Sequence, residues 1–372
     1  MTRVNQTIRR IANLLSLLAL SALFAAPYAV ADTITIGKGS GIVWEGMPFN
    51  ASNTAGTGAN PNLDPGRSVA FINPTNLASN NCVPDNWLTI IAGYKAFKIA
   101  PGVGIIPRAT ITASYVLANG TTETLNGTIG LPSTQGTTSS GITITNPLMG
   151  GSWCLAPRMS SVVNFYQANT LINATATGNW VMVADGTQTR QDNIALYNVN
   201  FSTAGNSLGF VPIFSRNTTL RISTLECTVN TPVQIDFGAV AKNTQSGAEL
   251  GLKTNTLTTQ CSQDGTSGIN ANINVQFRAL TGLFASTPTR LALSQGGGYI
   301  TGEISGGITG SGNCSGTSGV PFDNSQLKVG NITNAQSTQN TTNQITWRLC
   351  SGGNDLPTGN VSASAEMLVT FN

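Results

Sequence analysis

The sequence predicts an all-β protein made of two β-sandwich domains. From Asp32 onward, short runs rich in β-branched and aromatic residues are separated by turns dense in Gly, Asn, Pro and Ser. Apolar residues do not recur at helical spacing between two helix caps in this part of the chain. Residues 269–277 and 361–371 show the clearest alternation of apolar and polar side chains, which is typical of half-buried strands.

The first 31 residues have the pattern of a secretory signal peptide. Arg3, Arg9 and Arg10 precede an apolar run over residues 11–26, and residues 29–31 (Ala-Val-Ala) match a small-residue cleavage motif. The apolar run has about 16 residues, fewer than the roughly 20 that a membrane-spanning helix needs. We therefore expect cleavage after this motif and export of the mature chain.

The mature chain is expected to be neutral. The whole sequence has 18 basic and 15 acidic residues, but three of the basic residues and none of the acidic ones lie in the signal peptide, which leaves 15 of each. Charged residues make up only 9% of the chain, against about 25% in ordinary soluble domains. This composition favours a secreted β-protein and gives no argument for nucleic-acid binding, which needs clustered basic residues.

Length and cysteine content favour two disulfide-bonded domains. Removing 31 residues from 372 leaves 341, which exceeds one sandwich of about 100 residues. We predict an N-terminal domain over residues 32–216 and a C-terminal domain over residues 217–372. Six cysteines in an exported chain indicate disulfides; they are Cys82, Cys154, Cys227, Cys261, Cys314 and Cys350. If the domain boundary separates Cys154 from Cys227, Cys82 can pair only with Cys154, and three arrangements remain for the other four.

Four segments have specific local predictions. Residues 50–66 have no apolar period and are expected to form a long loop. Residues 219–229 and residues 233–240 are each expected to form a strand. Residues 302–319 are rich in Gly and Ser and are expected to form a loop.

The C-terminal region resembles the subunits that bacteria assemble through the chaperone–usher pathway. The resemblance rests on the alternating last strand, on the penultimate aromatic Phe371, and on Gly359, the fourteenth residue counted back from Asn372. It also rests on Cys227-Thr-Val, which precedes Pro232-Val-Gln-Ile-Asp-Phe-Gly-Ala-Val, and on the second cysteine at position 261. These motifs cover roughly the last 155 residues and say little about the residues before them.

The resemblance implies an incomplete Ig-like pilin domain that lacks its last strand and is open along one edge. A periplasmic chaperone would fill the open groove, and after passage through the outer-membrane usher the donor strand of the next subunit would replace it. The groove would follow Gly359, Val361, Ala363, Ala365, Met367, Val369, Phe371 and Asn372. The resemblance also implies a Cys227–Cys261 bridge, which leaves Cys314 to pair with Cys350.

The 185 residues between Ala31 and position 217 distinguish this chain from an ordinary shaft subunit, in which a short donor segment precedes a single domain. Residues 32–36 resemble such a segment, but Gly37, Gly39 and Gly41 interrupt it. Without a donor strand, the resemblance implies a tip adhesin at the extracellular end of the fimbria, with an N-terminal lectin-like domain that binds a host glycan or glycoprotein. Because the chaperone-type signature occurs only at the end of the second domain, we expect the N-terminal domain to fold alone. The alternatives are a structural tip or adaptor subunit and an adhesin for a host matrix protein.

Catalysis is not expected. The chain contains no His, which excludes Ser-His and Cys-His nucleophiles and histidine zinc sites. Residues 205–209 match G-x-S-x-G, but we attribute that match to chance because neither a histidine nor a following helix accompanies it. We expect no metal and no cofactor.

Ligand binding is predicted around a polar turn with an aromatic residue. Asp85, Asn86 and Trp87 offer donors, acceptors and a ring that could stack on a sugar, and a Cys82–Cys154 bridge would bring Trp153 near them. A tryptophan packed on a disulfide is also a common core feature of β-sandwiches, so Trp87 and Trp153 have two interpretations. Trp44 with Glu45 forms a second candidate.

Overall fold

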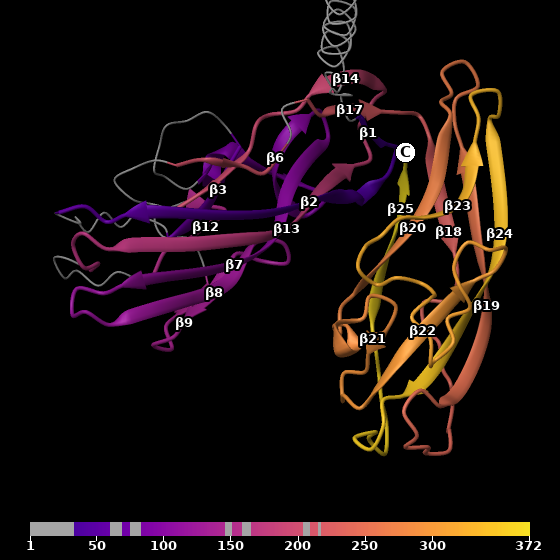
Figure 1. The fold of residues 1–372 in the computed structure, drawn as a ribbon. Helices are drawn as coiled ribbons and strands as arrows, with labels where there is room; N and C mark the ends of the chain where they lie inside the picture. Colours follow the sequence, from indigo (N-terminus) through magenta and orange to yellow (C-terminus); the bar gives the residue numbers. More distant parts are fainter. Residues whose placement is uncertain are drawn as a thin grey trace, which may run out of the picture. The chain divides into compact units, whose positions relative to one another are not determined.

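The computed structural model describes residues 33–59, 69–74, 83–145, 151–157, 165–203, 209–214 and 217–372 (Figure 1). The predicted signal peptide, Cys82, and the G-x-S-x-G motif up to residue 208 lie outside these residues. The described chain consists of β-strands, turns and two short 3-10 helices, η2 (Asp85–Trp87) and η4 (Phe284–Ser286), which confirms the all-β prediction. In the part of the chain that the structure describes, no helix is long and apolar enough to cross a membrane.

The largest sheet of the described residues has eight antiparallel strands. Its order is β10-β9-β8-β7-β13-β2, with β6 also paired to β7 and β5 paired to β6. These strands are β2 (Ser40–Gly56), β5 (Leu88–Ile91), β6 (Tyr94–Ala100), β7 (Val103–Val116), β8 (Thr122–Gly130), β9 (Gln135–Thr138), β10 (Thr143–Ile144) and β13 (Leu171–Asp185). The long strand β7 buries Ile111, Ala113 and Tyr115 on one face and turns the residues between them outward, so its alternation fixes which face packs.

Two smaller sheets pack against this one. One has the order β12-β3-β15-β16 and the other pairs β11 with β4. Their strands are β3 (Ala70–Asn73), β4 (Val83–Pro84), β11 (Gly151–Ser152), β12 (Cys154–Leu155), β15 (Asn200–Ser202) and β16 (Val211–Pro212). The first hydrophobic core is centred on Trp180, whose ring contacts Phe49, Trp153 and Phe214 and whose indole N–H donates to the Ile213 carbonyl at 3.0 Å. Because that polar hydrogen is satisfied, the indole is buried without penalty.

A six-stranded sheet has the order β14-β17-β1-β25-β20-β23. Its strands are β1 (Thr33–Ile36), β14 (Gln191–Ala195), β17 (Thr219–Ile222), β20 (Ala271–Ala279), β23 (Leu327–Ile332) and β25 (Ala365–Phe371). β1 runs parallel to β17 over its whole length and meets β25 only where Thr35 lies opposite Phe371. Leu220 and Ile222 of β17 are buried in the first core, although they follow the predicted domain boundary. That boundary therefore stays a prediction, and any division of the two cores falls after Ile222.

The fifth sheet faces β20, β23 and β25 across a second hydrophobic core. Its order is β18-β19-β24-β22-β21, and its strands are β18 (Glu226–Asn230), β19 (Glu249–Ser262), β21 (Leu291–Ala292), β22 (Gly298–Ile304) and β24 (Thr338–Ser351). Leu257 and Ile345 from this sheet meet Ile273 and Val275 from β20. The two layers with apolar residues between them form a β-sandwich.

Disulfides hold the second sandwich. Cys227 and Cys261 are cross-strand partners on β18 and β19 and are bonded, and Cys314 is bonded to Cys350 at the end of β24. Both predicted pairings are thus confirmed. Cys154 is also disulfide-bonded, but its predicted partner Cys82 lies outside the described residues.

The prediction of a long loop over residues 50–66 is wrong for the part that ends at Gly56. This segment completes β2 and pairs residue by residue with β13, as Thr54 does with Asn173. Ala51, Asn53 and Ala55 point inward in alternation with polar residues. The period was present, but small and amide side chains occupied its buried positions, so hydrophobicity did not reveal it.

Residues 219–229 and 233–240 also differ from prediction. The first segment is broken after Ile222, because β17 pairs with β1 and β14 whereas β18 pairs with β19. The second segment is not a strand, since an extended chain needs a hydrogen-bonded neighbour and none of the described strands pairs with it. A local turn, in which the Gly238 N–H donates to the Asp236 carboxylate at 2.8 Å, also interrupts it. The predicted loop over residues 302–319 begins only after Ile304, the end of β22.

Candidate functional site

Strand β25 has one paired edge and one edge that the described strands leave almost free. On one side all seven of its residues pair with β20, from Ala365 opposite Ala279 to Phe371 opposite Ile273 (Figure 1). On the other side, among the strands that the structure describes, only β1 pairs with it, and only where Thr35 lies opposite Phe371. Residues 365–370 therefore present backbone donors and acceptors that another strand could pair with.

The alternation predicts the apolar face of β25 at Met367, Val369 and Phe371, but Ala365 on the same face is exposed and Thr370 on the opposite face is fully buried. Phe371 is buried in the second core, and Met367 and Val369 are half-buried against it. Val361 and Ala363 share this period but precede the strand, which begins at Ala365 rather than near Gly359; Gly359 has a φ of 94°, a left-handed conformation suited to glycine.

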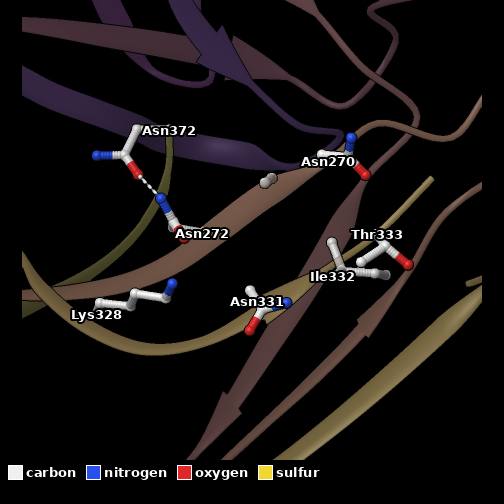
Figure 2. Close-up of a pocket in the computed structure, with 8 residues that line it drawn as sticks. Asn270, Asn272, Lys328, Asn331, Ile332, Thr333 and Asn372 are labelled. Atoms are coloured by element: carbon white, nitrogen blue, oxygen red, sulfur yellow. Dashed lines mark hydrogen bonds between the residues drawn. The ribbon is translucent and has the colours of Figure 1, made fainter.

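The far end of β25 is anchored by amides. The Asn272 N–H donates to the Asn372 carbonyl at 2.8 Å, and the side-chain amide of Asn272 donates to the Asn372 side-chain oxygen at 3.0 Å (Figure 2). The Asn372 amide in turn donates to the Gln326 side-chain oxygen at 2.9 Å. Asn272 and Asn372 lie at a shallow polar hollow of about 290 Å³ that Lys328 and Asn331 also line. Hydrogen bonds therefore fix the carboxyl end of β25, and the unpaired edge lies along the residues that precede this end.

A second unpaired segment borders the same sandwich. Between β18 and β19, residues 231–248 contain no strand, and Val233 is fully exposed. Phe237 and Val240 lie over Gly251 of β19, where a Cβ placed on the glycine would meet each of them at 3.2 Å. Apolar residues thus lack a covering strand at two places on the second sandwich, along β25 and over β19.

A buried ionic cluster lies on the outer face of β20 and β25. Glu45 of β2 is only 2% exposed; its Oε1 is 3.2 Å from Arg108 Nε, without the angle of a hydrogen bond. Glu366 of β25 lies 3.8 Å from Arg108 and is also bonded to Arg278. The Gln276 amide donates to the Glu45 carbonyl at 3.3 Å. The polar face of β25 is therefore tied to β2 and β7 by charges.

Burial sets the ionisation of Glu45. Loss of solvent raises the pKa of its carboxyl above the ordinary value of 4.5, and Arg108 and Arg278 oppose that rise without cancelling it. A raised folded-state pKa means that the folded protein holds this proton more tightly than the unfolded chain. The stabilising contribution is complete below pH 4.5 and is lost as pH rises through the raised pKa.

We expect a comparison of the wild type with Glu45→Gln to show that the contribution of Glu45 to stability falls as pH rises. The difference in unfolding free energy, wild type minus variant, should fall as pH is raised from below 4.5 towards neutrality. Urea unfolding at a series of pH values measures it. A difference that grows with pH would show that the Arg108 ion pair, rather than burial, dominates.

A cavity of about 520 Å³ adjoins the predicted ligand turn. Asp85 of η2 lines it together with Lys95 of β6 and Ser152 of β11. Lys95 Nζ is 2.6 Å from Asp85 Oδ2, and the Ser152 hydroxyl donates to Asp85 Oδ1. Partial burial disfavours the Asp85 carboxylate, but these two bonds outweigh it and hold its pKa below the ordinary value. Asp85 is therefore ionised at neutral pH.

The other predicted ligand residues are not all brought to this cavity. Trp153 lines it but is only 2% exposed and contacts Trp180 edge-on, with 6.4 Å between ring centroids, so most of its ring belongs to the core. Trp87 is 37% exposed, and neither it nor the exposed Asn86 lines the cavity. Trp44 and Glu45 are buried elsewhere.

Sequence reasoning missed Lys95 and Tyr94, which face Asp85 and Ser152 from the β5–β6 hairpin. Their signal was weak, because nothing local to either residue shows that the hairpin folds towards η2. The position of the hairpin turn itself does have a local feature, because φ is positive at both Ala92 and Gly93.

The two tryptophans near the cavity should respond differently to truncation. Trp153→Ala should lower the free energy of unfolding by about 3–5 kcal/mol, since it empties part of a packed core. Trp87→Ala should change it by about 0.5 kcal/mol or less, because the side chain is substantially exposed. Denaturant unfolding of both variants measures this. An equal loss in the two would mean that Trp87 also packs in the core.

No family model matches this chain, and no curated protein matches it. Similar solved structures include the CsuC–CsuE chaperone–tip adhesion subunit pre-assembly complex from archaic chaperone–usher Csu pili of Acinetobacter baumannii, at 11% identity and a TM-score of 0.25, over 91% of this chain and 98% of that chain. The CupB6 tip adhesin from Pseudomonas aeruginosa is similar at 11% identity and a TM-score of 0.30, over 89% and 87%. A chaperone–tip adhesin complex described as vital for activation of CFA/I fimbriae biogenesis is similar at 9% identity and a TM-score of 0.24, over 91% and 95%. The solved structures to which this chain is similar are thus a tip adhesin and complexes that contain a chaperone and a tip subunit.

Proposed function

We propose that this chain is the tip adhesin of a chaperone–usher fimbria. Its N-terminal region binds a ligand on a host surface, a glycan in the first place, and its C-terminal region joins the chain to the fibre by donor-strand complementation. Its partners are a periplasmic chaperone, the outer-membrane usher and the donor strand of the next subunit. Its final location is the extracellular end of the fimbria.

The free edge of β25 carries this proposal. An unpaired strand edge beside half-buried Met367 and Val369 is an aggregation hazard unless another strand covers it. Addition of a strand would pair the free backbone groups of the edge and would also cover the apolar side chains. The backbone of the added strand does the first, and every second side chain of that strand does the other. A chaperone strand would do this before assembly, and a subunit strand would do it afterwards.

The position at the tip is supported by strand β1. A shaft subunit gives up its N-terminal segment to a neighbour, whereas β1 pairs with β17 of its own chain. Ile34 and Ile36 are buried in the first core. Pulling β1 out would expose both side chains, so this segment is not free to complement another subunit.

Labelling of assembled fibres tests the proposal. An antibody against residues 32–216 should bind only at fibre ends, and loss of this chain should abolish attachment to host cells while shaft subunits are still exported. Label distributed along the shaft would refute the tip position. Label at the ends with unchanged attachment would instead identify a structural tip or adaptor subunit.

A further inference from the structure

The cavity beside Asp85 is formed where separate segments converge. η2 supplies Asp85, the β5–β6 hairpin supplies Tyr94 and Lys95, and the turn after β8 supplies residues 130–134. Ser152 and Trp153 also line it. A volume of about 520 Å³ lies within the range of small-molecule pockets, which is about 300–1,000 Å³.

The charges of this cavity are balanced. Asp85 and Lys95 are the charged residues among those that line it in the described structure, and their side chains are each 45% exposed. Their ion pair therefore remains accessible to a ligand from solvent. A carboxylate accepts hydrogen bonds and an ammonium group donates them. The pair therefore places an acceptor and a donor 2.6 Å apart, where one ligand can reach both.

The rest of the wall combines apolar and hydroxyl groups. Tyr94, Leu131 and Pro132 supply apolar surface, and Ser133 and Thr134 supply hydroxyls. The Thr134 oxygen already accepts a hydrogen bond from the Gly130 N–H at 3.0 Å, which leaves its own O–H to donate. A ligand with an apolar face and a rim of hydroxyls matches this wall.

Resting on the proposed function, we propose that this cavity binds a neutral sugar of the adhesin's ligand, with vicinal hydroxyls bridging Asp85 and Lys95. One hydroxyl donates to the Asp85 carboxylate and a neighbouring oxygen accepts from the Lys95 ammonium group. The C–H face of the sugar ring lies on Tyr94 and Pro132. Hydrogen bonds to charged groups are about twice as strong as neutral ones, so this pair sets the orientation of the ring.

Charge balance excludes charged sugars from this cavity. A carboxylated sugar that approaches Lys95 brings its negative charge next to Asp85, and a protonated amino sugar that approaches Asp85 brings its positive charge next to Lys95. Each charged ligand therefore gains one attraction and one repulsion of similar size, because the two charges of the pair lie next to each other. A neutral sugar keeps the pair and adds hydrogen bonds to it, so it loses no electrostatic interaction.

Binding of defined sugars to the full chain tests this inference. The probes are a panel of neutral hexose oligosaccharides, their sialylated counterparts, and glucosamine-terminated oligosaccharides. The variants are Asp85→Asn, Lys95→Gln and their combination, with Asp355→Asn and Lys253→Gln as matched controls on exposed residues outside the cavity. Unfolding midpoints are measured for all variants, and Ser152→Ala offers a second substitution at the cavity if Asp85→Asn fails to fold.

The wild-type chain should bind one or more neutral oligosaccharides, and each single variant at the cavity should weaken that binding about tenfold or more. Asp85→Asn should shift the preference towards sialylated probes and Lys95→Gln towards glucosamine-terminated probes, whereas the controls should change nothing. Binding of sialylated probes alone by the wild type, or neutral binding that survives both substitutions, would overturn the inference. After either of these two outcomes, attachment of intact wild-type fibres to host cells separates the two proposals. If the fibres attach, the adhesin function still stands; if they do not attach, that function is refuted as well.

Discussion

Removal of residues 366–372 is expected to leave the chain insoluble or degraded in the periplasm. Phe371 is buried in the second core, and β20 would lose its partner along the whole of β25. Truncating one buried Phe costs about 3–5 kcal/mol, while a whole domain is stable by only about 5–15 kcal/mol. The deletion also removes the edge that a chaperone strand would cover. Soluble yield after periplasmic expression, with and without a chaperone of this class, measures the effect.

Point variants test whether the buried face of β25 is responsible for this effect. Phe371→Asp should reproduce the deletion, because it places a charge in an apolar core. Ser364→Asp serves as a matched control, since this exposed residue just precedes the strand and should leave the yield unchanged. Normal amounts of soluble chain from the deletion would contradict the role assigned to β25.

A fragment that ends at residue 216 is expected not to fold, in contrast to the expectation drawn from sequence motifs. Such a fragment lacks β17, whose Leu220 and Ile222 are buried in the first core and whose backbone pairs with both β1 and β14. Burial of each of these side chains contributes about 1.5–3 kcal/mol. Their loss, together with that of two strand pairings, consumes most of the stability of a typical domain.

Extending the fragment by one strand should restore folding. Residues 32–224, expressed in an oxidising compartment, should be soluble and unfold cooperatively, whereas residues 32–216 should show no cooperative transition in circular dichroism. A shorter fragment as stable as the longer one would mean that β17 is dispensable. Failure of both would mean that the first core depends on the C-terminal region as well.

The sequence could predict those elements whose side-chain pattern is decided locally. The alternation over residues 269–277 and 361–371 predicts strands β20 and β25, because Val, Ile and Phe occupy their buried positions. The alternation of side chains cannot show where a strand ends when the end depends on which neighbouring strand is available for pairing. Residues 233–238 also alternate, yet they form no strand, because no described neighbour pairs with them.

The candidate site was predictable only in part, for a similar reason. Asp85 was found because its turn joins a carboxylate to amide and aromatic residues. Lys95 and Ser152 were not, since they reach Asp85 from segments 10 and 67 positions away in the chain. Trp153 had a core and a ligand interpretation, and its contact with Trp180 makes it chiefly a core residue. Such distinctions depend on tertiary packing.

Hydrogen exchange at the free edge of β25 tests the central claim most directly. An alternating apolar strand of about ten residues can be attached behind Asn372 through a flexible linker, with the same residues in scrambled order as a control. We expect the alternating strand to slow amide exchange over residues 365–370 and to raise the unfolding midpoint, while the scrambled strand does neither. Unchanged exchange with both strands would contradict the claim that this edge accepts a donated strand.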